Sequence, residues 1–181
     1  MKDRPNDVLL LAGKVLTILM QGAIAIGGVI VALLIPIVVI FRGDIMQGFI
    51  DGSQIDISAF PLAPFVGLLM LILAAVAALF VFFGKLRAII GTVGEGDPFV
   101  PENANRLNLM AWLMLGLQIL GIPIMGLVML IVSWADEVGN ADANIDAGVD
   151  LTGILMVIIL FILARVFKHG AEMREDLEGT V

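Results

Sequence analysis

Four long apolar stretches dominate this chain of 181 residues. The first covers residues 15–41, a run of 27 residues without a charge between Lys14 and Arg42. At a helical rise of about 1.5 Å per residue it would extend roughly 40 Å, which exceeds the roughly 30 Å hydrocarbon core of a bilayer. A helix satisfies its own backbone hydrogen bonds, as any segment that crosses lipid must do. The apolar stretches therefore predict membrane-spanning helices.

The pattern predicts a single membrane domain over residues 1–181, with an all-α fold. The spans are expected at about residues 15–41, 61–83, 108–134 and 149–167. Between them lie a central loop at residues 84–107 and two acidic loops at residues 42–60 and 135–148. The share of hydrophobic residues is 60%, above the roughly 45–50% of soluble domains. We therefore expect an integral membrane four-helix bundle made of two transmembrane hairpins.

The basic residues predict which loops face the cytoplasm. Of the 10 lysines and arginines, three lie in the N-terminal segment, three in the central loop and three at the C-terminal end. The remaining one is Arg42, in the first acidic loop. Loops rich in Lys and Arg stay on the cytoplasmic side of a membrane. The expected topology is N-in and C-in, with the central loop inside and both acidic loops outside.

The sequence offers little to an enzyme. It has no cysteine and one histidine, His169, which lies at a charged helix end where a solvated imidazole is expected. Gly91, Gly94 and Gly96 lack the Lys-Ser/Thr that completes a phosphate-binding loop. The acidic loops offer oxygen ligands but not the spacing of a calcium-binding loop, so a solvated loop is the favoured interpretation. We predict no catalytic, cofactor-binding or metal-binding residues, and the net charge of -7 argues against direct contact with nucleic acid.

Few polar residues lie inside the predicted spans. Gln21 and Gln118 are expected to form hydrogen bonds between helices. No ionisable residue lies near the centre of a span, which argues against proton-coupled transport but leaves a path for an apolar compound open. Small residues four apart, such as those at positions 23 and 27 or 28 and 32, would allow close helix packing, although their abundance in membrane helices explains them equally well.

The central loop combines basic residues with turn-forming ones. Residues 85–93 have apolar side chains at helical spacing, which suits a helix lying along the inner membrane surface. Gly96 and Pro98 should end it, Asp97 is interpreted as a helix cap, and Pro101 as the first turn of the next helix. The sequence leaves three interpretations of Phe99 open: its side chain enters the membrane interface, docks a partner or anchors the turn.

Two segments together resemble a known family. Residues 96–107 read GDPFVPENANRL, and residues 163–167 read LARVF, followed by Gly170, Met173 and Asp176. Both resemble signatures of a family of small bacterial four-span membrane proteins catalogued as a domain of unknown function. The resemblance extends over nearly the whole chain. It departs at the C-terminus, where Gly179 replaces the apolar residue that the family places before Thr180 and Val181.

The resemblance implies a location and a partner. Members of the family are often encoded beside a very small helix-turn-helix regulator of the Cro type, and they are multi-pass proteins of the bacterial cytoplasmic (inner) membrane. It implies a regulatory membrane protein that binds the cytoplasmic regulator. The empty inventory of catalytic motifs predicts that it is non-enzymatic, and the four-span bundle is expected to contact the lipid bilayer and further copies of itself. A small oligomeric transporter or permeability factor is the alternative. The residues carried over as candidate partner contacts are Asp97, Pro98, Phe99, Asn103, Arg106, Arg165 and Gly170.

Overall fold

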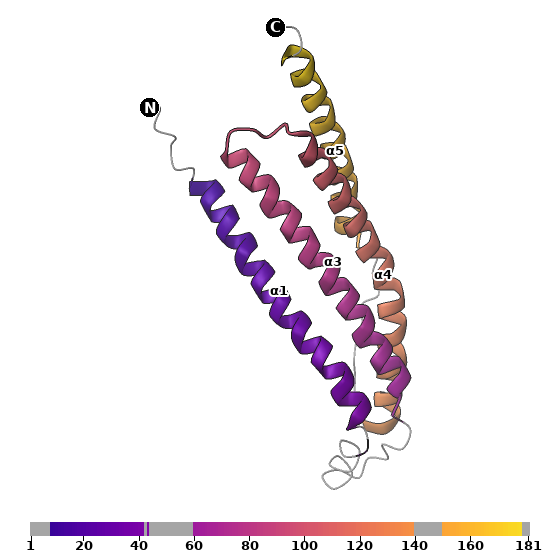
Figure 1. Cartoon of the computed structure of the whole chain (residues 1–181). Helices are drawn as coiled ribbons and strands as arrows, with labels where there is room; N and C mark the ends of the chain where they lie inside the picture. The colour runs from indigo at the N-terminus through magenta and orange to yellow at the C-terminus, as the bar shows by residue number, and fades with distance from the viewer. Residues whose placement is uncertain (1–7, 42, 44–59, 140–149, 179–181) are drawn as a thin grey trace. The chain divides into compact units, whose positions relative to one another are not determined.

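Long helices make up the part of the chain that the structure describes. The computed structural model describes residues 8–41, 43, 60–139 and 150–178. The helices with defined bounds are α1 (Val8–Ile40), α3 (Leu62–Gly94), α4 (Pro101–Gly139) and α5 (Leu151–Glu178) (Figure 1). Each is long and apolar enough to cross a membrane. The all-α fold and the multi-pass membrane character are thereby confirmed. Most of the two predicted acidic loops lies outside the described residues.

The helices continue beyond the predicted spans. α1 begins seven residues before position 15, and α3 continues to Gly94 without a break at position 84. The expected surface helix at residues 85–93 is therefore the end of α3 and not a separate element. α4 starts at Pro101, as the sequence predicts, so residues 95–100 form the connection between α3 and α4. The positions of the membrane boundaries along these helices stay predictions.

Helix α1 exposes most of its large apolar side chains. Within this fully described helix, Thr17 is the one buried residue, and its hydroxyl donates to the carbonyl of Lys14 at 2.9 Å. Side chains such as Leu9, Ile26 and Leu33 are more than half exposed. Such a contiguous apolar surface would be costly in water, because burial of apolar surface is the main favourable term in folding. Lipid contact removes that cost, which fits α1 as a membrane span.

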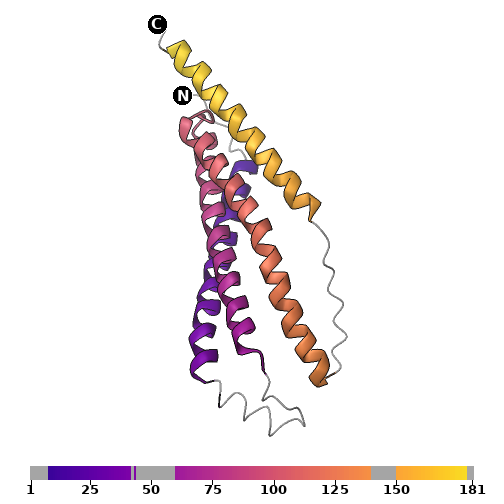
Figure 2. The ribbon, with the colours of Figure 1, turned by 90° about the vertical axis from the view of Figure 1, so that its right-hand side faces the viewer.

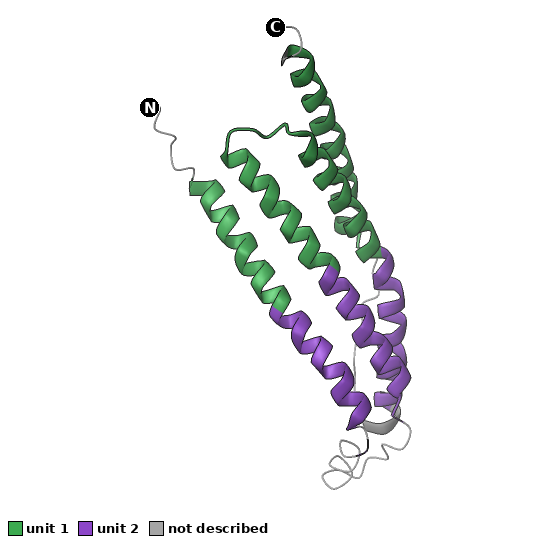
Figure 3. Cartoon of the chain, viewed as in Figure 1, with its two compact units in different colours: residues 1–25, 78–118, 150–181 green, residues 26–77, 119–149 purple. Residues whose placement is uncertain are grey.

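The described chain divides into two compact units, each built from parts of several helices (Figure 3). Unit 1 contains residues 1–25, 78–118 and 150–181. Its core joins the end of α3 to the first half of α4 and to α5, which run beside each other in Figure 2. The buried members of this core are Ile89, Leu107, Met110, Ala111, Leu160 and Ala164. Small residues such as Ala111, which is fully buried, allow the helices to approach closely.

Unit 2 contains residues 26–77 and 119–149. The ring of Phe60 packs edge-on against Trp134, with ring centroids 5.3 Å apart, at the start of α3 and the end of α4. A Cβ atom at Gly67 would lie 3.3 Å from Leu127, so α3 and α4 are close at this point.

Two adjacent glycines in α1 have different surroundings. A Cβ atom on Gly28 would lie 3.0 Å from Cγ1 of Val76 on α3, whereas a Cβ atom on Gly27 would have nothing within 4 Å. Both small-residue faces of α1 were candidates for helix packing from the sequence. Within unit 2 the structure selects the face of Gly28 for contact with α3.

Replacing Gly28 by Leu is expected to lower the thermal stability of the detergent-solubilised protein. Overpacking of this kind costs about 1–3 kcal/mol, because Val76 and the helix backbone must move apart. Gly27→Leu is the matched control, since it adds the same side chain one position away into open space. The fraction of protein that stays monodisperse after heating measures both. An equal loss for the two variants would contradict the assigned packing face.

Candidate functional site

The connection between α3 and α4 is a tightly hydrogen-bonded turn. The backbone N–H of Gly96 donates to the carbonyl of Val93 at 3.1 Å, and that of Asp97 donates to the carbonyl of Thr92 at 3.0 Å. This pair of bonds ends a helix with its last carbonyls satisfied. Gly96 has a φ of 86°, in the left-handed region that residues with a Cβ rarely adopt. Glycine at this position therefore stops α3 where the sequence expects it to stop.

Asn103 holds the connection from the inside. Its side chain is 0% exposed. Its Nδ2 donates to the carbonyl of Pro98 at 2.9 Å and to the hydroxyl of Thr92 at 2.7 Å. Its Oδ1 accepts a hydrogen bond from Arg106 at 2.7 Å. One buried amide thus links the end of α3, the turn and the first turns of α4.

These contacts change the interpretation of two candidate residues. Asn103 was a candidate partner contact, but its side chain has no accessible surface, so its role is internal. Arg106 is partly buried, and one of its guanidinium nitrogens is directed to Asn103. A buried polar group must keep its hydrogen bonds, because leaving one unmade costs about 1–3 kcal/mol. Both residues therefore shape the connection.

The connection also contacts α5, far along the chain. The carboxylate of Asp97 forms an ion pair with Arg174. Because α4 begins at Pro101, the cap position belongs to Val100 and not, as the sequence had suggested, to Asp97. The ring of Phe99 packs against Phe167, with centroids 5.4 Å apart. A Cβ atom at Gly170 would lie 2.6 Å from the Phe99 ring, so only glycine leaves room for that ring. Phe99 is thus an anchor of the turn.

A groove of about 440 Å³ lies where the connection meets α5. We call it the α5 groove, and its lining residues are Phe99, Arg165, Val166, His169, Gly170 and Met173. Phe99 keeps 41% of its surface exposed, and Val166 and Met173 keep 54% and 51%. The groove therefore has an apolar surface with two nitrogen-bearing side chains at its edge.

The structure brings the two signature segments together. Phe99 from the first segment and Arg165 and Gly170 from the second line the same groove. Val166 and Met173 belong to the second signature but were not among the candidate partner contacts, although they lie seven residues apart and so share a face of α5. Sequence reasoning missed Arg174, because nothing in the sequence pairs it with an aspartate 77 positions away.

The glutamines inside the helices form the expected bonds between elements. Nε2 of Gln21 donates to the carbonyl of Phe80 on α3 at 3.3 Å. Nε2 of Gln118 donates to Oδ2 of Asp150 at 3.0 Å, and Oδ1 of Asp150 accepts from the backbone N–H of Gly153 at 3.0 Å. Asp150 therefore caps the N-terminus of α5.

The partner of Gln118 was not foreseen. Gln118 lies midway along α4, between Pro101 and Gly139. The sequence placed Asp150 at the outer end of the fourth span, whereas the structure places its carboxylate beside the middle of α4. A Cβ atom on Gly153 would overlap the Gln118 amide, so this glycine makes room for the contact. An ionisable side chain is thus brought to the centre of an apolar helix.

Comparisons with known proteins define the family and nothing more specific. The model of a family described as a protein of unknown function, DUF2975, matches residues 52–181. No curated protein and no solved structure matches the chain. In the described residues, no group of three or more His, Asp or Glu side chains could hold a metal ion. The match includes α3, α4 and α5 but not α1, so it is shorter than the resemblance suggested. It nevertheless covers well over half of the sequence, and the chain belongs to the DUF2975 family of proteins of unknown function.

Proposed function

We propose that this chain is a non-enzymatic, regulatory membrane protein that binds a small helix-turn-helix regulator at its cytoplasmic end. The α5 groove is the observation that supports the proposal, because it joins the two segments that resemble family signatures. Binding there would hold the regulator at the membrane and away from its DNA site. The kind of partner follows from the gene neighbourhood that the resemblance implies.

The composition of the α5 groove suits a protein partner. Val166 and Met173 are exposed apolar side chains at the end of α5 where charged residues gather. Apolar surface among charged residues is a common mark of a protein interface. Arg165, which also lines the groove, would suit an acidic side chain on the partner. The apolar surface then supplies affinity, and Arg165 supplies orientation.

The connection that forms one wall of the groove is held in place before any partner arrives. Asn103 fixes its interior, and the Asp97–Arg174 ion pair fixes it to α5. A surface that is already ordered loses less conformational entropy on binding. The internal roles of Asp97, Asn103 and Arg106 are therefore compatible with a binding surface made by their neighbours.

The proposed topology places both termini and the α3–α4 connection in the cytoplasm of a bacterial cell, with this protein in the inner membrane. It is supported by the nine basic residues that fall on one side of the predicted spans. A fluorescent reporter that matures only in the cytoplasm should be active when fused after Val181 or inserted at Glu95. A phosphatase that is active only outside the cytoplasm should be active when inserted at Asp142. The reverse pattern would contradict the topology.

Val166→Glu combined with Met173→Glu is expected to reduce capture of the regulator by about tenfold or more. Loss of a hot-spot contact at the centre of an interface costs about 2 kcal/mol or more, and a buried carboxylate adds to that cost. The measurement is co-purification of the tagged product of the adjacent regulator gene with solubilised membranes. Leu177→Glu is the matched control, because it makes the same change of chemistry on α5 outside the groove. Retention of no regulator by the unaltered protein would contradict the proposed function.

A small oligomeric transporter or permeability factor is the second candidate, and the Gln118–Asp150 contact favours it. Ionisable side chains at membrane depth are costly and usually serve a function. If the chain carries cations, Asp150→Asn should abolish their flux into proteoliposomes, while Asp136→Asn near the end of α4 should not. Flux that is absent from the unaltered protein, or unchanged by Asp150→Asn, would remove this candidate.

A further inference from the structure

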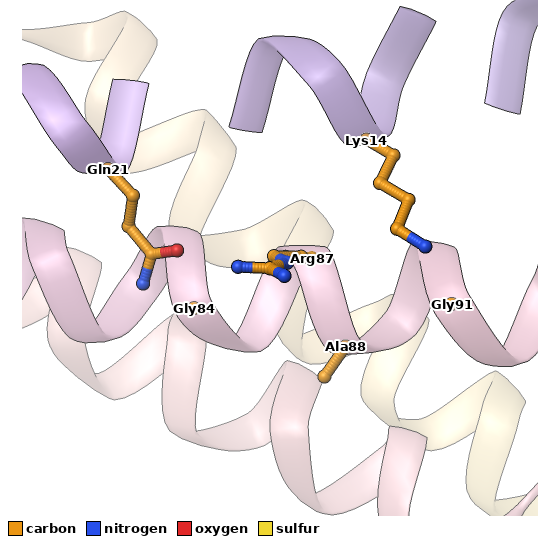
Figure 4. A pocket seen from close by; sticks show the side chains of 6 residues that line it. All are labelled: Lys14, Gln21, Gly84, Arg87, Ala88 and Gly91. Carbon is orange, nitrogen blue, oxygen red and sulfur yellow. The ribbon is translucent and has the colours of Figure 1, made fainter. Parts of the chain in front are cut away.

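A pocket of about 380 Å³ lies between the first half of α1 and the last third of α3. Its lining residues are Lys14, Gln21, Gly84, Arg87, Ala88 and Gly91, all of which belong to unit 1. Figure 4 shows Lys14 and Gln21 extending from α1 towards α3, with Arg87 of α3 between them. We call it the α1–α3 pocket, and it contains none of the residues of the α5 groove.

The pocket exists because small residues of α3 face long side chains of α1. A Cβ atom on Gly84 would lie 3.0 Å from Nε2 of Gln21, and a Cβ atom on Gly91 would have nothing within 4 Å. Gly84 and Gly91 are seven residues apart, as are Gln21 and Lys14, so each pair spans two turns of its helix. The spacing of the two glycines on α3 therefore matches the spacing of the two long side chains on α1. Because the glycines have no side chains, the space between the two helices stays open.

The charge of the pocket is positive. Lys14 and Arg87 both line it and both have exposed side chains, and no lining residue is acidic. Within residues 8–41, 43, 60–139 and 150–178, no carboxylate forms an ion pair with either of them. Two cations that face a shared space repel each other unless an anion lies between them. The pocket is therefore suited to an anionic group.

We infer that the α1–α3 pocket binds a phosphate group, carried by the headgroup of an anionic phospholipid or by a free phosphate anion. The planar guanidinium of Arg87 can donate two parallel hydrogen bonds to phosphate oxygens, and Lys14 supplies a second charge. Gln21 uses one amide hydrogen for the carbonyl of Phe80 and has a second one to donate. Three donors from two helices then surround one anion.

The surroundings of the pocket favour the lipid source. Lys14 lies directly before the uncharged run of α1, and Arg87 lies just beyond the predicted end of the second span. Exposed apolar side chains of α1 lie beside Lys14 on the helix, at Leu11 and Ile18, three and four residues away, and offer contact for acyl chains. Basic pockets between transmembrane helices are known binding sites for anionic headgroups. A phosphate bound by Lys14 and Arg87 would also connect α1 to α3.

The inference can be tested with the full chain in a neutral detergent. The probes are short-chain phosphatidylglycerol, short-chain phosphatidylcholine and inorganic phosphate. The readout is the apparent affinity obtained from the ligand-dependent rise of the thermal midpoint. Phosphatidylglycerol should raise the midpoint, and the double variant Lys14→Gln/Arg87→Gln should weaken its apparent affinity by about tenfold or more. Lys85→Gln/Lys168→Gln removes the same charge outside the pocket and should have little effect.

A second variant separates the pocket from net charge. Gly91→Leu would fill the pocket and keep both cations, and it should weaken binding, whereas Gly116→Leu on α4 adds the same side chain to open space. If inorganic phosphate raises the thermal midpoint and phosphatidylglycerol does not, and both pocket variants weaken the apparent affinity for phosphate, the free anion is the source. Equal losses in the control variants, or no response of the unaltered protein to any anionic probe, would overturn the inference.

Discussion

The buried amide of Asn103 is the interaction on which the end of the structure around the α3–α4 connection depends. It satisfies the carbonyl of Pro98 and the hydroxyl of Thr92, and it orients Arg106. It thereby joins the end of α3, the turn and the first turns of α4 through one side chain. Phe99 lies in the turn that this amide holds, and its ring can fill the space above Gly170 only from that position. The α5 groove is therefore a consequence of one satisfied polar group in an otherwise apolar molecule.

The sequence predicted what depends on composition and local chemistry. Long uncharged runs are sufficient to predict four spanning helices, and Pro101 marked the start of α4 because proline suits a first helical turn. It could not predict pairings across many residues. Asp97 looked like a cap because a local rule applied to it, but the structure gives it a partner on α5. Asp150 was expected at the outer end of the fourth span, since the sequence alone cannot reveal that its side chain meets Gln118 in the middle of α4.

Helix α1 differs from the rest of the chain in two respects. It lies outside the matched family region, and it contributes no member to the core shared by α3, α4 and α5. Its contact with α3 in unit 1 depends on the Gln21 hydrogen bond, the close approach at Gly13 and the buried Thr17. Because α1 makes so few contacts with α3 in unit 1, a ligand that binds both helices can strengthen its attachment to α3. The α1–α3 pocket lies at that weak contact, where a shared anion would add most to it.

Helix α3 lines the α1–α3 pocket and also holds the connection that forms one wall of the α5 groove. Arg87 lines the α1–α3 pocket, while Thr92, five residues further on, receives the hydrogen bond from Asn103. Ile89 lies between them in the core of unit 1. An anion that restrains Arg87 would act on the same last turns of α3 that hold the α3–α4 connection. Lipid charge and partner binding would then be linked through one rigid helix, because a ligand at one site can stabilise the arrangement that the other site requires.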